Sequence, residues 1–316
     1  MNKTVVVICG PTASGKTEIA SNLCAMIGGE IISADSRQVY RLLDTGTNKS
    51  GIYDAAKKIR YTAAGISQHL TDIINPDEIF SAGDFSREAG KLIDNLINSK
   101  IVPVITGGTG LYIKSLVNGL SPMPEKDEAL RAELKELITK YGTDRLYLQL
   151  KKADPESAEK NRYNPQRLIR AVEVLRLTGK PMSYWHSKTS APDLNFIQFA
   201  PLWKREELYN NINERSSVML KSGMIEETKK ALSSGYDKES AGLGSIGYKH
   251  IINLINGQLD TKQTEELISQ DTRRYAKRQM TWFRRVPGIN WIETDKSSFD
   301  PKLIASAISK RIQNML

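Results

Sequence analysis

The sequence predicts an α/β fold: a parallel β-sheet flanked by helices, with a helical domain inserted into the chain. Short β-branched runs alternate with segments of helical apolar spacing in the first part of the chain. A glycine-rich loop joins the first such strand to the first helix. Strand-like runs stop at residue 121 and resume after residue 188. We therefore assign residues 1–120 and 189–316 to the core and residues 121–188 to the inserted helical domain.

The N-terminal part of the chain reads as strand, loop, helix and strand. Thr4–Gly10 is a β-branched run that ends in glycine, and Lys16–Ile27 has apolar residues at helical spacing. Ile31–Ser33 continues as a strand, Asp84–Asn98 predicts a helix, and Ile101–Thr106 predicts a buried strand closed by glycines. This alternation is typical of a parallel sheet.

The rest of the chain is mainly helical. Asp127–Tyr141 and Gln166–Leu177 read as charged amphipathic helices of the inserted domain. The remaining predicted elements are a strand at Phe196–Trp203, a long helix at Glu206–Leu232, a helix at Lys262–Arg285 and a last strand at Asn290–Thr294.

Composition narrows the class of protein. The chain has 316 residues, of which 40% are hydrophobic, but no apolar run approaches the roughly 20 residues that span a bilayer. The N-terminal segment leads into the glycine-rich loop and not into a cleavage site. Cys9 and Cys24 lie in apolar runs and read as core residues, which excludes a cysteine-held metal. We expect a cytoplasmic protein, without a membrane segment, that is a monomer.

A phosphate-binding loop follows the first strand. The loop fits the pattern G-x4-G-K-[ST] and lies between a strand and a helix, as its mechanism requires. Its backbone N–H groups and the helix N-terminus attract phosphate, the lysine reaches the terminal phosphates, and the Thr17 hydroxyl is a ligand for Mg²⁺. The fold is therefore like that of P-loop nucleoside triphosphate hydrolases, with a nucleotide or another pyrophosphate as ligand. The loop residues are Gly10, Pro11, Thr12, Ala13, Ser14, Gly15, Lys16 and Thr17.

One acid stands at the end of a predicted strand. Asp35 follows Ile31–Ser33, where a doubly wound sheet faces its ligand crevice. The strand Ile101–Thr106 ends without a carboxylate, which disfavours routine ATP hydrolysis. From spacing alone, Asp35 is equally a catalytic residue, a helix N-cap or a carboxylate that supports a magnesium site.

Several motifs together resemble the bacterial tRNA dimethylallyltransferases, from Gly10 to at least Trp291. The chain departs from that family's usual pattern at Asn48–Ser50 and Arg162–Asn164, and it lacks the C-terminal zinc finger of eukaryotic relatives. The motifs are GPTASGKT at Gly10–Thr17, SADSRQVY at Ser33–Tyr40, GTNK at Gly46–Lys49, GGTGLYI at Gly107–Ile113, QRLIRAVEV at Gln166–Val174 and AKRQMTWFR at Ala276–Arg284.

The resemblance implies a reaction and roles for particular residues. The dimethylallyl group of dimethylallyl diphosphate passes to N6 of the adenosine on the 3′ side of the anticodon, and pyrophosphate leaves. The resemblance implies that Asp35 is the catalytic base and that Arg215 is an additional pyrophosphate-binding residue. It also implies that Thr109 lies near the adenine base and the prenyl donor. An adenine in a stacked loop has to be flipped out to reach such a site.

The resemblance also implies that the anticodon stem-loop of tRNA is the macromolecular partner. Lys and Arg outnumber Asp and Glu by 45 to 36, giving a net charge of +9. The basic helix around Thr272–Arg285 then favours phosphate contact over a merely solvated face, and the inserted domain offers a second patch. The expected tRNA contacts are Asp35, Ser36, Arg37, Gln38, Thr109, Arg131, Gln166, Arg167, Leu168, Ile169, Arg170, Gly244, Ser245, Ile246, Gly247, Tyr248, Lys249, Arg273, Arg274, Lys277 and Arg278.

Two other classes of function share parts of this pattern. A small-molecule or nucleoside kinase uses the same loop and a strand-end acid, and the inserted domain would then be a lid. A nucleotide switch or RNA-binding protein would use the loop only to sense a nucleotide. The missing second metal acid and the basic patches disfavour the kinase, and Asp35 in the crevice disfavours the switch.

Overall fold

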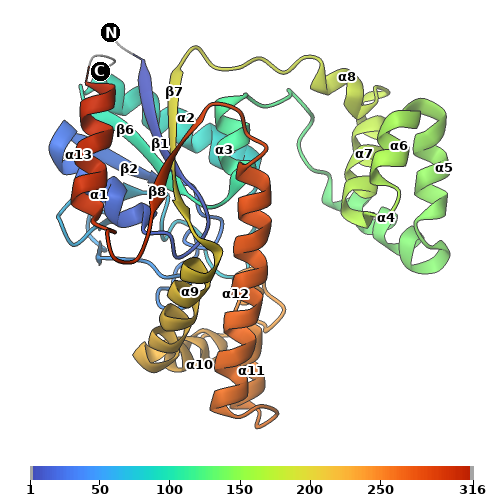
Figure 1. The fold of residues 1–316 in the computed structure, drawn as a ribbon. Coiled ribbons are helices and arrows are strands. Elements are labelled where there is room, and N and C mark those ends of the chain that lie inside the picture. Colours follow the sequence, from blue (N-terminus) through green and yellow to red (C-terminus); the bar gives the residue numbers. More distant parts are fainter. Residues whose placement is uncertain (1–2, 314–316) are drawn as a thin grey trace. The chain divides into compact units, whose positions relative to one another are not determined.

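A computed structural model describes residues 3–313. The chain divides into two compact units: one comprises the chain up to Val117 and from Asp193 onward, and the other comprises Asn118–Pro192. The expected limits of the inserted domain, 121 and 188, lie inside the second unit. Figure 1 shows the first unit as a sheet with helices on both faces and the second as helices alone. The predicted α/β class is confirmed.

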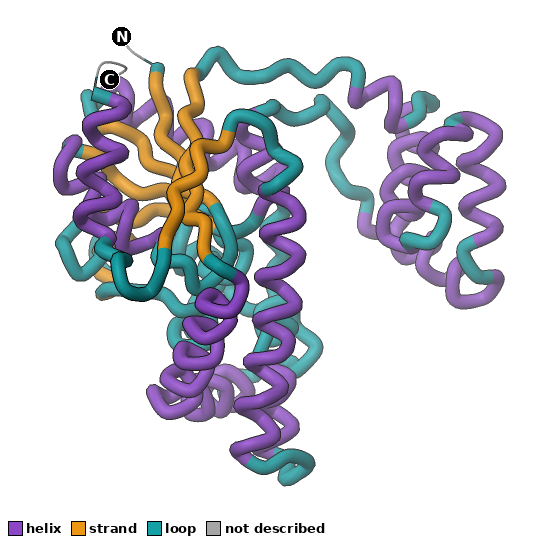
Figure 2. The backbone as a smooth tube through the Cα atoms, in the orientation of Figure 1, coloured by secondary structure: helices purple, strands orange, loops and turns teal. Residues whose placement is uncertain are grey.

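An eight-stranded sheet is the frame of the first unit, with strand order β3-β4-β5-β2-β6-β1-β7-β8. The strands from β5 to β8 in that order run parallel, whereas β3, β4 and β5 pair antiparallel. Figure 2 shows the strands gathered in the middle of this unit. The strands are β1 (Thr4–Cys9), β2 (Gly29–Ser33), β3 (Ile52–Asp54), β4 (Ile59–Tyr61), β5 (Ser67–His69), β6 (Val102–Gly107), β7 (Asn195–Trp203) and β8 (Ile289–Thr294).

Alternating side chains of the central strands feed two separate cores. Val5 and Val7 of β1 point to the face that helices α2 (Ala82–Asn98) and α3 (Gly110–Val117) cover. Val6 and Ile8 point to the opposite face, which α1 (Lys16–Ile27) and α13 (Pro301–Ile312) cover. All four are buried because β1 lies between β6 and β7 and has helices on both sides. Cys9 and Cys24 are free thiols inside these cores, as predicted.

The helices of the first unit extend beyond the sheet, where α9 and α12 pack against each other. No described helix is long and apolar enough to cross a lipid bilayer. The helices of this unit are α1 (Lys16–Ile27), α2 (Ala82–Asn98), α3 (Gly110–Val117), α9 (Arg205–Met219), the π-helical turn η1 (Leu220–Met224), α10 (Ile225–Ser233), α11 (Tyr248–Ile255), α12 (Thr261–Phe283) and α13 (Pro301–Ile312).

The helical stretch predicted over Glu206–Leu232 is present but is interrupted once. Helix α9 ends at Met219, and the chain leaves helical geometry at Ser222 and Gly223 before α10 begins. Gly223 has a φ of 106°, which a residue with a Cβ rarely adopts. The apolar spacing continues through this break, so periodicity alone did not reveal it.

The second unit is a bundle of short helices around its own core. Its helices are α4 (Glu128–Tyr141), α5 (Asp144–Ala153), α6 (Pro155–Asn161), α7 (Pro165–Thr178) and α8 (Met182–His186). Leu168 and Ile169 of α7 pack into this core with 0% and 8% exposure. Helix α7 thus turns these two side chains inward, and RNA contact at Leu168 and Ile169 stays a prediction.

A buried carboxylate organises one side of this bundle. Glu173 of α7 is fully buried and accepts hydrogen bonds from Arg131 Nε at 2.7 Å, Arg170 Nη1 at 2.6 Å and the Asp127 N–H at 2.9 Å. Burial alone would raise the pKa of Glu173, but the bonds from Arg131 and Arg170 outweigh it and hold that pKa below its ordinary value. Two of the arginines expected to grip RNA thus join α4 to α7.

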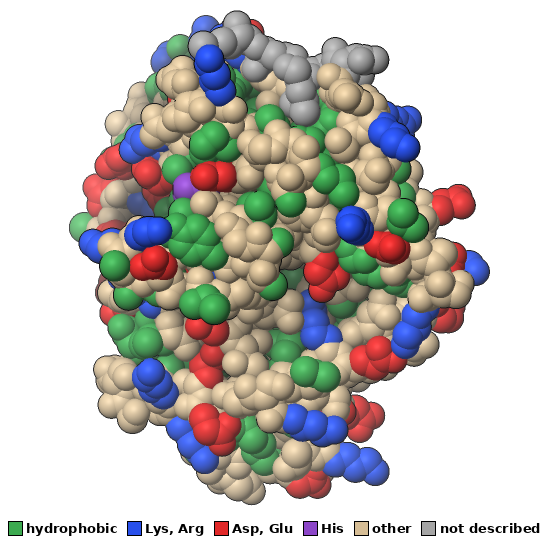
Figure 3. All heavy atoms as spheres, turned by 90° about the vertical axis from the view of Figure 1, so that its left-hand side faces the viewer, with side chains coloured by type: hydrophobic (Ala, Val, Ile, Leu, Met, Phe, Trp, Pro, Cys, Tyr) green, Lys and Arg blue, Asp and Glu red, His purple; other side chains and the backbone are tan. Residues whose placement is uncertain are grey.

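Charged side chains of both signs are spread over the face drawn in Figure 3. Lys and Arg side chains alternate there with Asp and Glu over the described atoms, with hydrophobic side chains between them. The excess of nine positive charges therefore says little about a partner by itself. Clusters of Lys and Arg on particular helices are better evidence for a polyanionic partner.

We predict that Glu173→Gln destabilises the protein by about 2–3 kcal/mol, because two half-buried guanidinium groups lose the buried carboxylate that pairs with both. Urea unfolding of wild type and variant measures this difference. Because the pKa of Glu173 is lowered in the folded state, its stabilisation is complete above its ordinary pKa and is lost as pH falls through the lowered value. The exposed Glu136→Gln on α4 is the matched control, and an equal loss in both variants would contradict the assignment.

Candidate active site

The carboxyl ends of three neighbouring strands supply the site. The phosphate loop follows β1, Asp35 follows β2 and Gly107–Thr109 follows β6, and these strands are adjacent in the order β2-β6-β1. The Ala34 N–H donates to the Thr106 carbonyl at 2.7 Å. A Cβ at Gly107 would lie 2.2 Å from the Ala34 carbonyl oxygen, so only glycine allows this approach. The sheet thus fixes Asp35 beside the phosphate loop.

The phosphate loop has the curled backbone that anion binding needs. Gly10, Ala13 and Gly15 have positive φ angles of 139°, 60° and 79°, and α1 begins at Lys16. Successive left-handed and right-handed residues turn backbone N–H groups toward one point. The Ser14 hydroxyl donates to the Pro11 carbonyl at 2.8 Å and braces the curl from inside. The predicted loop is therefore preformed.

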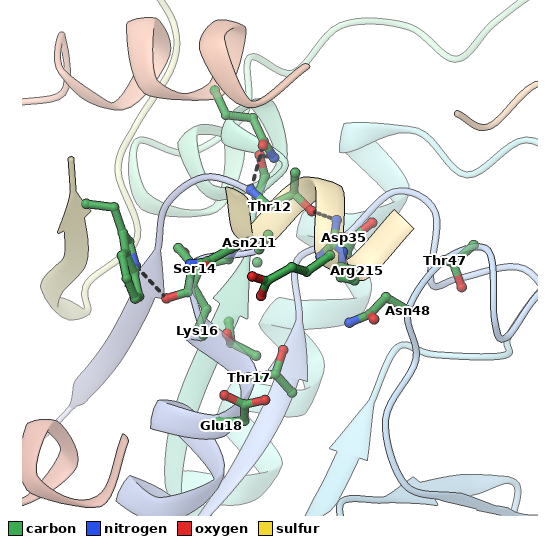
Figure 4. A pocket seen from close by; sticks show the side chains of 18 of the residues that line it. Thr12, Ser14, Lys16, Thr17, Glu18, Asp35, Thr47, Asn48, Asn211 and Arg215 are labelled. Atoms are coloured by element: carbon green, nitrogen blue, oxygen red, sulfur yellow. Dashed lines mark hydrogen bonds between the residues drawn. The ribbon is translucent and has the colours of Figure 1, made fainter. Parts of the chain in front are cut away.

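Two cations and one carboxylate meet above this loop. Lys16, Asp35 and Arg215 line the same cavity, together with Thr17 and Asn48, as Figure 4 shows. Burial lowers the pKa of Lys16 to about 8, against the attraction of Asp35. Burial also lowers the pKa of Arg215 to about 10, again against the attraction of Asp35. Glu18, Glu214 and Lys296 also line this cavity, so the excess of positive charge is confined to Lys16, Asp35 and Arg215 next to the loop, where it suits an anion.

Arg215 comes from α9 and is aimed at the loop. Its Nη2 donates to the Thr12 hydroxyl at 2.6 Å, and its Nε is buried without a partner among the described residues. A buried donor without an acceptor is costly unless a ligand satisfies it. The interpretation of Arg215 as an anion contact is consistent with this geometry, whereas a solvated helix charge is not.

Gln279 of α12 joins two of the loops and was not among the predicted site residues. Its Oε1 accepts the Thr12 N–H at 2.8 Å, and its Nε2 donates to the Gly108 carbonyl at 2.8 Å. Its side chain is buried and lines both cavities described below. Its place in the segment AKRQMTWFR, Ala276–Arg284, is the sequence signal that could have found it.

Two cavities share one wall. The first, of about 550 Å³, lies over the phosphate loop, and the second, of about 430 Å³, lies against α12. Both are lined by Thr12, Asp35, Arg215 and Gln279. The second cavity also has Tyr275 and several apolar side chains, among them Met219, Ile246, Ile268 and Trp282. A phosphate-bearing ligand in the first cavity and a flat ring in the second would meet at Asp35.

Thr109 fixes the turn that carries the carboxylate. Its Oγ1 accepts the Ser36 N–H at 2.9 Å and donates to Ser36 Oγ at 3.3 Å. The Arg37 N–H donates to Asp35 Oδ1 at 2.8 Å. The Thr109 carbonyl accepts the first N–H groups of α3. Thr109 therefore lines the second cavity and orients the turn at Asp35 at the same time.

The basic residues of α12 are placed differently from one another. Arg273 is bonded to Asn213 at 2.5 Å, and Arg274 is paired with Asp271 at 3.2 Å. Lys277 and Arg278 are exposed, and Arg278 lies over the Tyr275 ring and lines the second cavity. Arg284 and Arg285 follow the end of the helix. An exposed cationic stripe beside a cavity remains a candidate surface for RNA phosphates.

The other predicted RNA contacts divide by burial. Ser36, Arg37, Ser245 and Ile246 line the second cavity. Gly244, Lys249, Gln166 and Arg167 are exposed, whereas Gly247 is buried. Gln38 is enclosed and donates to the Thr47 and Asn48 carbonyls, and Tyr248 is fully buried. Gln38 nevertheless lines the first cavity, and RNA contact at Gln38 and Tyr248 stays a prediction.

Comparison with known proteins identifies the family. The sequence model described as IPP transferase matches residues 38–286. A tRNA dimethylallyltransferase of Endomicrobium trichonymphae is 48% identical over 290 residues, 91% of this chain and 94% of that protein. A tRNA dimethylallyltransferase of Geobacter sulfurreducens is 40% identical over 292 residues, 92% of this chain and 91% of that protein.

Solved structures agree with the sequence comparison. A tRNA isopentenylpyrophosphate transferase from Bacillus halodurans superposes with a TM-score of 0.69 at 32% identity and covers 99% of this chain and 98% of its own. A eukaryotic dimethylallyltransferase acting on tRNA superposes with a TM-score of 0.80 at 25% identity, over 99% of this chain and 80% of its own. Fold and sequence therefore point to the same family.

We predict that pyrophosphate binding weakens as pH rises through about 8, where Lys16 loses its proton in the ligand-free protein. Between pH 7 and 9 the ratio of the dissociation constants of wild type and Lys16→Arg should rise about tenfold, because only the wild type has to take up a proton. Calorimetry in two buffers of different ionisation enthalpy also measures the proton uptake. The same pH slope in both proteins would show that Lys16 is charged throughout this range.

Proposed function

Because this chain belongs to the IPP transferase family, we propose that it transfers the dimethylallyl group of dimethylallyl diphosphate to N6 of an adenosine in tRNA and releases pyrophosphate. The acceptor we propose is the adenosine on the 3′ side of the anticodon. The observation that carries the mechanism is the shared wall of the two cavities, where Asp35 and Arg215 face both. The proposal includes a monomeric protein that works in the cytoplasm.

The first cavity fits the diphosphate of the donor. The loop backbone, Lys16 and the unpartnered Nε of Arg215 offer donors to its oxygens. As the C–O bond of the donor breaks, negative charge builds up on the leaving pyrophosphate. Fixed cations in a buried site stabilise that charge more than they stabilise the bound donor, and this difference speeds the reaction.

The residues at the loop fit a magnesium ion that is held mainly by the substrate. The described residues contain no cluster of three or more His, Cys, Asp or Glu that could hold a metal alone. Mg²⁺ in phosphate sites keeps several waters and uses one or two protein oxygens beside the phosphates. Thr17 would hold the ion, since its hydroxyl lines the first cavity beside the phosphate loop. When bound, it would neutralise part of the pyrophosphate charge.

Asp35 is the group placed to act on the acceptor. The amino group of adenine is a weak nucleophile because its lone pair is delocalised into the ring, so removal or orientation of its proton assists attack. Asp35 lines both cavities, and the Arg37 N–H orients its carboxylate. The new C–N bond forms as the C–O bond to the pyrophosphate breaks, and the N6 proton passes to Asp35.

The second cavity fits a base that has been flipped out of its stack. It contains aromatic and apolar side chains beside polar loop atoms, and exposed cations of α12 stand at its edge. Flipped bases are commonly held by stacking on such side chains, while the backbone phosphates contact nearby lysine and arginine. In the inserted unit, Gln166 and Arg167 are exposed at the start of α7, and we assign them to a separate RNA contact of that unit.

One incubation tests the proposed function. The protein is mixed with unmodified tRNA and either labelled dimethylallyl diphosphate or labelled ATP. We expect label from the prenyl donor in one adenosine of the anticodon loop, with one pyrophosphate released for each transfer. Transfer of phosphate from ATP to any acceptor, without prenyl transfer, would instead identify a kinase.

Replacing the proposed base should separate chemistry from binding. We predict that Asp35→Asn lowers kcat by roughly 10² or more and leaves tRNA affinity within a few-fold. Its affinity for pyrophosphate should hold or improve, because a negative charge leaves the wall of an anion site. The exposed Asp77→Asn is the matched control. Single-turnover rates near wild type would eliminate Asp35 as the base.

The basic helix makes a prediction about salt. If Arg274 and Arg278 contact tRNA phosphates, neutralising both to Gln should reduce the slope of log K against log salt by about 0.7–0.9 for each lost contact. The affinity for all tRNAs should fall by the same factor, since phosphate contacts do not read bases. Lys302→Gln with Lys310→Gln on α13 makes the same charge change at residues that line neither cavity. Equal slopes for the two double variants would remove α12 from the RNA surface.

A further inference from the structure

The loop Asp44–Asn48 is a wall of both cavities but lies outside the strand ends that build the site. Thr47 and Asn48 line both cavities, and Gly46 lines the second. Figure 4 shows Thr47 and Asn48 on the loop that closes one side of the first cavity. A loop without a regular strand or helix keeps one conformation only if other groups fix it.

Glu227 of α10 binds this loop through its backbone. Its Oε2 accepts the N–H of Asp44 at 2.5 Å and the N–H of Thr45 at 2.7 Å. Its Oε1 accepts the N–H of Gly46 at 3.0 Å and the hydroxyl of Tyr248 at 2.6 Å. Three consecutive N–H groups thus converge on one carboxylate, and hydrogen bonds to a charged acceptor are the strong ones.

The packing beneath the loop leaves it little freedom. Tyr248 is fully buried, and a Cβ at Gly46 would lie 2.4 Å from its ring. At the other end of the loop, the side chain of Lys49 is completely buried and pairs with Asp44 at 2.7 Å and with Asp72 at 2.5 Å. The carboxylate of Glu227 therefore completes a set of bonds that holds the loop at both ends.

We propose that Glu227 is a positioning residue for the transfer reaction: it holds the backbone of Asp44–Gly46 so that Thr47 and Asn48 shape the space where donor and acceptor meet. Glu227 lines neither cavity, so it acts through the loop. The proposal rests on the prenyl transfer proposed above. It also assigns Tyr248 a role in orienting Glu227, in place of contact with RNA.

Replacing Glu227 should lower the turnover rate and disturb the acceptor side of the site. The residues that hold pyrophosphate lie on the phosphate loop and α9, and none of them is bonded to Glu227 in the described structure. Gly46 lines only the second cavity, with Thr109 and Tyr275. Displacing groups around reacting atoms by about 1 Å can cost on the order of 10²-fold in rate.

The test uses the full chain with Glu227→Gln, and with the exposed neighbour Glu226→Gln as control. For Glu227→Gln we expect kcat for prenyl transfer to fall by about 10- to 100-fold, with the pyrophosphate dissociation constant within about twofold of wild type. Amide hydrogen exchange should speed up at Asp44, Thr45 and Gly46 and stay unchanged in the phosphate loop. Unchanged exchange at the three amides, or unchanged kcat, would overturn the proposal.

Tyr248→Phe provides a milder second variant, which removes one of the four donors and keeps the ring. We expect a smaller fall in kcat than for Glu227→Gln, and little further fall when the two changes are combined, because both act through one carboxylate. Equal losses of kcat and pyrophosphate binding would indicate general unfolding and contradict the proposal. If the wild type transfers no prenyl group, the proposed function fails, while hydrogen exchange still reports whether Glu227 holds the backbone of Asp44–Gly46.

Discussion

The structure depends on a charge imbalance at the carboxyl edge of its sheet. Lys16 and Arg215 are two half-buried cations that face the carboxylate of Asp35, and desolvation lowers the pKa of both cations. Such an arrangement is unfavourable in the empty protein, because desolvated charges need partners. It becomes favourable when a polyanion enters. The site is preformed for such a ligand by the curled phosphate loop, the unpartnered Nε of Arg215 and the cavity between them.

The surrounding fold holds these charges in place against their repulsion. Hydrogen bonds between the ends of β2 and β6 fix Asp35, and Gln279 ties the phosphate loop to Gly108. Helix α9 supplies Arg215, and α12 supplies both Gln279 and the exposed cations beside the second cavity. Because the same few side chains line both cavities, one rigid wall can serve the diphosphate on one side and the acceptor base on the other.

The sequence revealed the parts of the site that follow from local patterns. The spacing of glycines, lysine and threonine located the loop from Gly10 to Thr17, and sheet logic placed Asp35 beside it. Gln279 escaped because its partners are distant in the chain, as Thr12 lies 267 positions away. The motif around Leu168 does not indicate that this side chain packs into the core of the inserted unit, which follows from the helical period of α7. The break at Gly223 was missed because apolar spacing does not report a single φ angle.

The central claim is that Lys16 and Arg215 are kept for an anion at the expense of stability, and melting temperatures with and without pyrophosphate test it most directly. Lys16→Met and Arg215→Met replace each cation by a neutral side chain of similar reach. Without ligand, we expect both variants to melt at or above the wild-type temperature, because an unbalanced buried charge is gone. With pyrophosphate, wild type should gain several degrees and the variants little. Variants that melt well below wild type without ligand, yet still gain stability from pyrophosphate, would contradict the account.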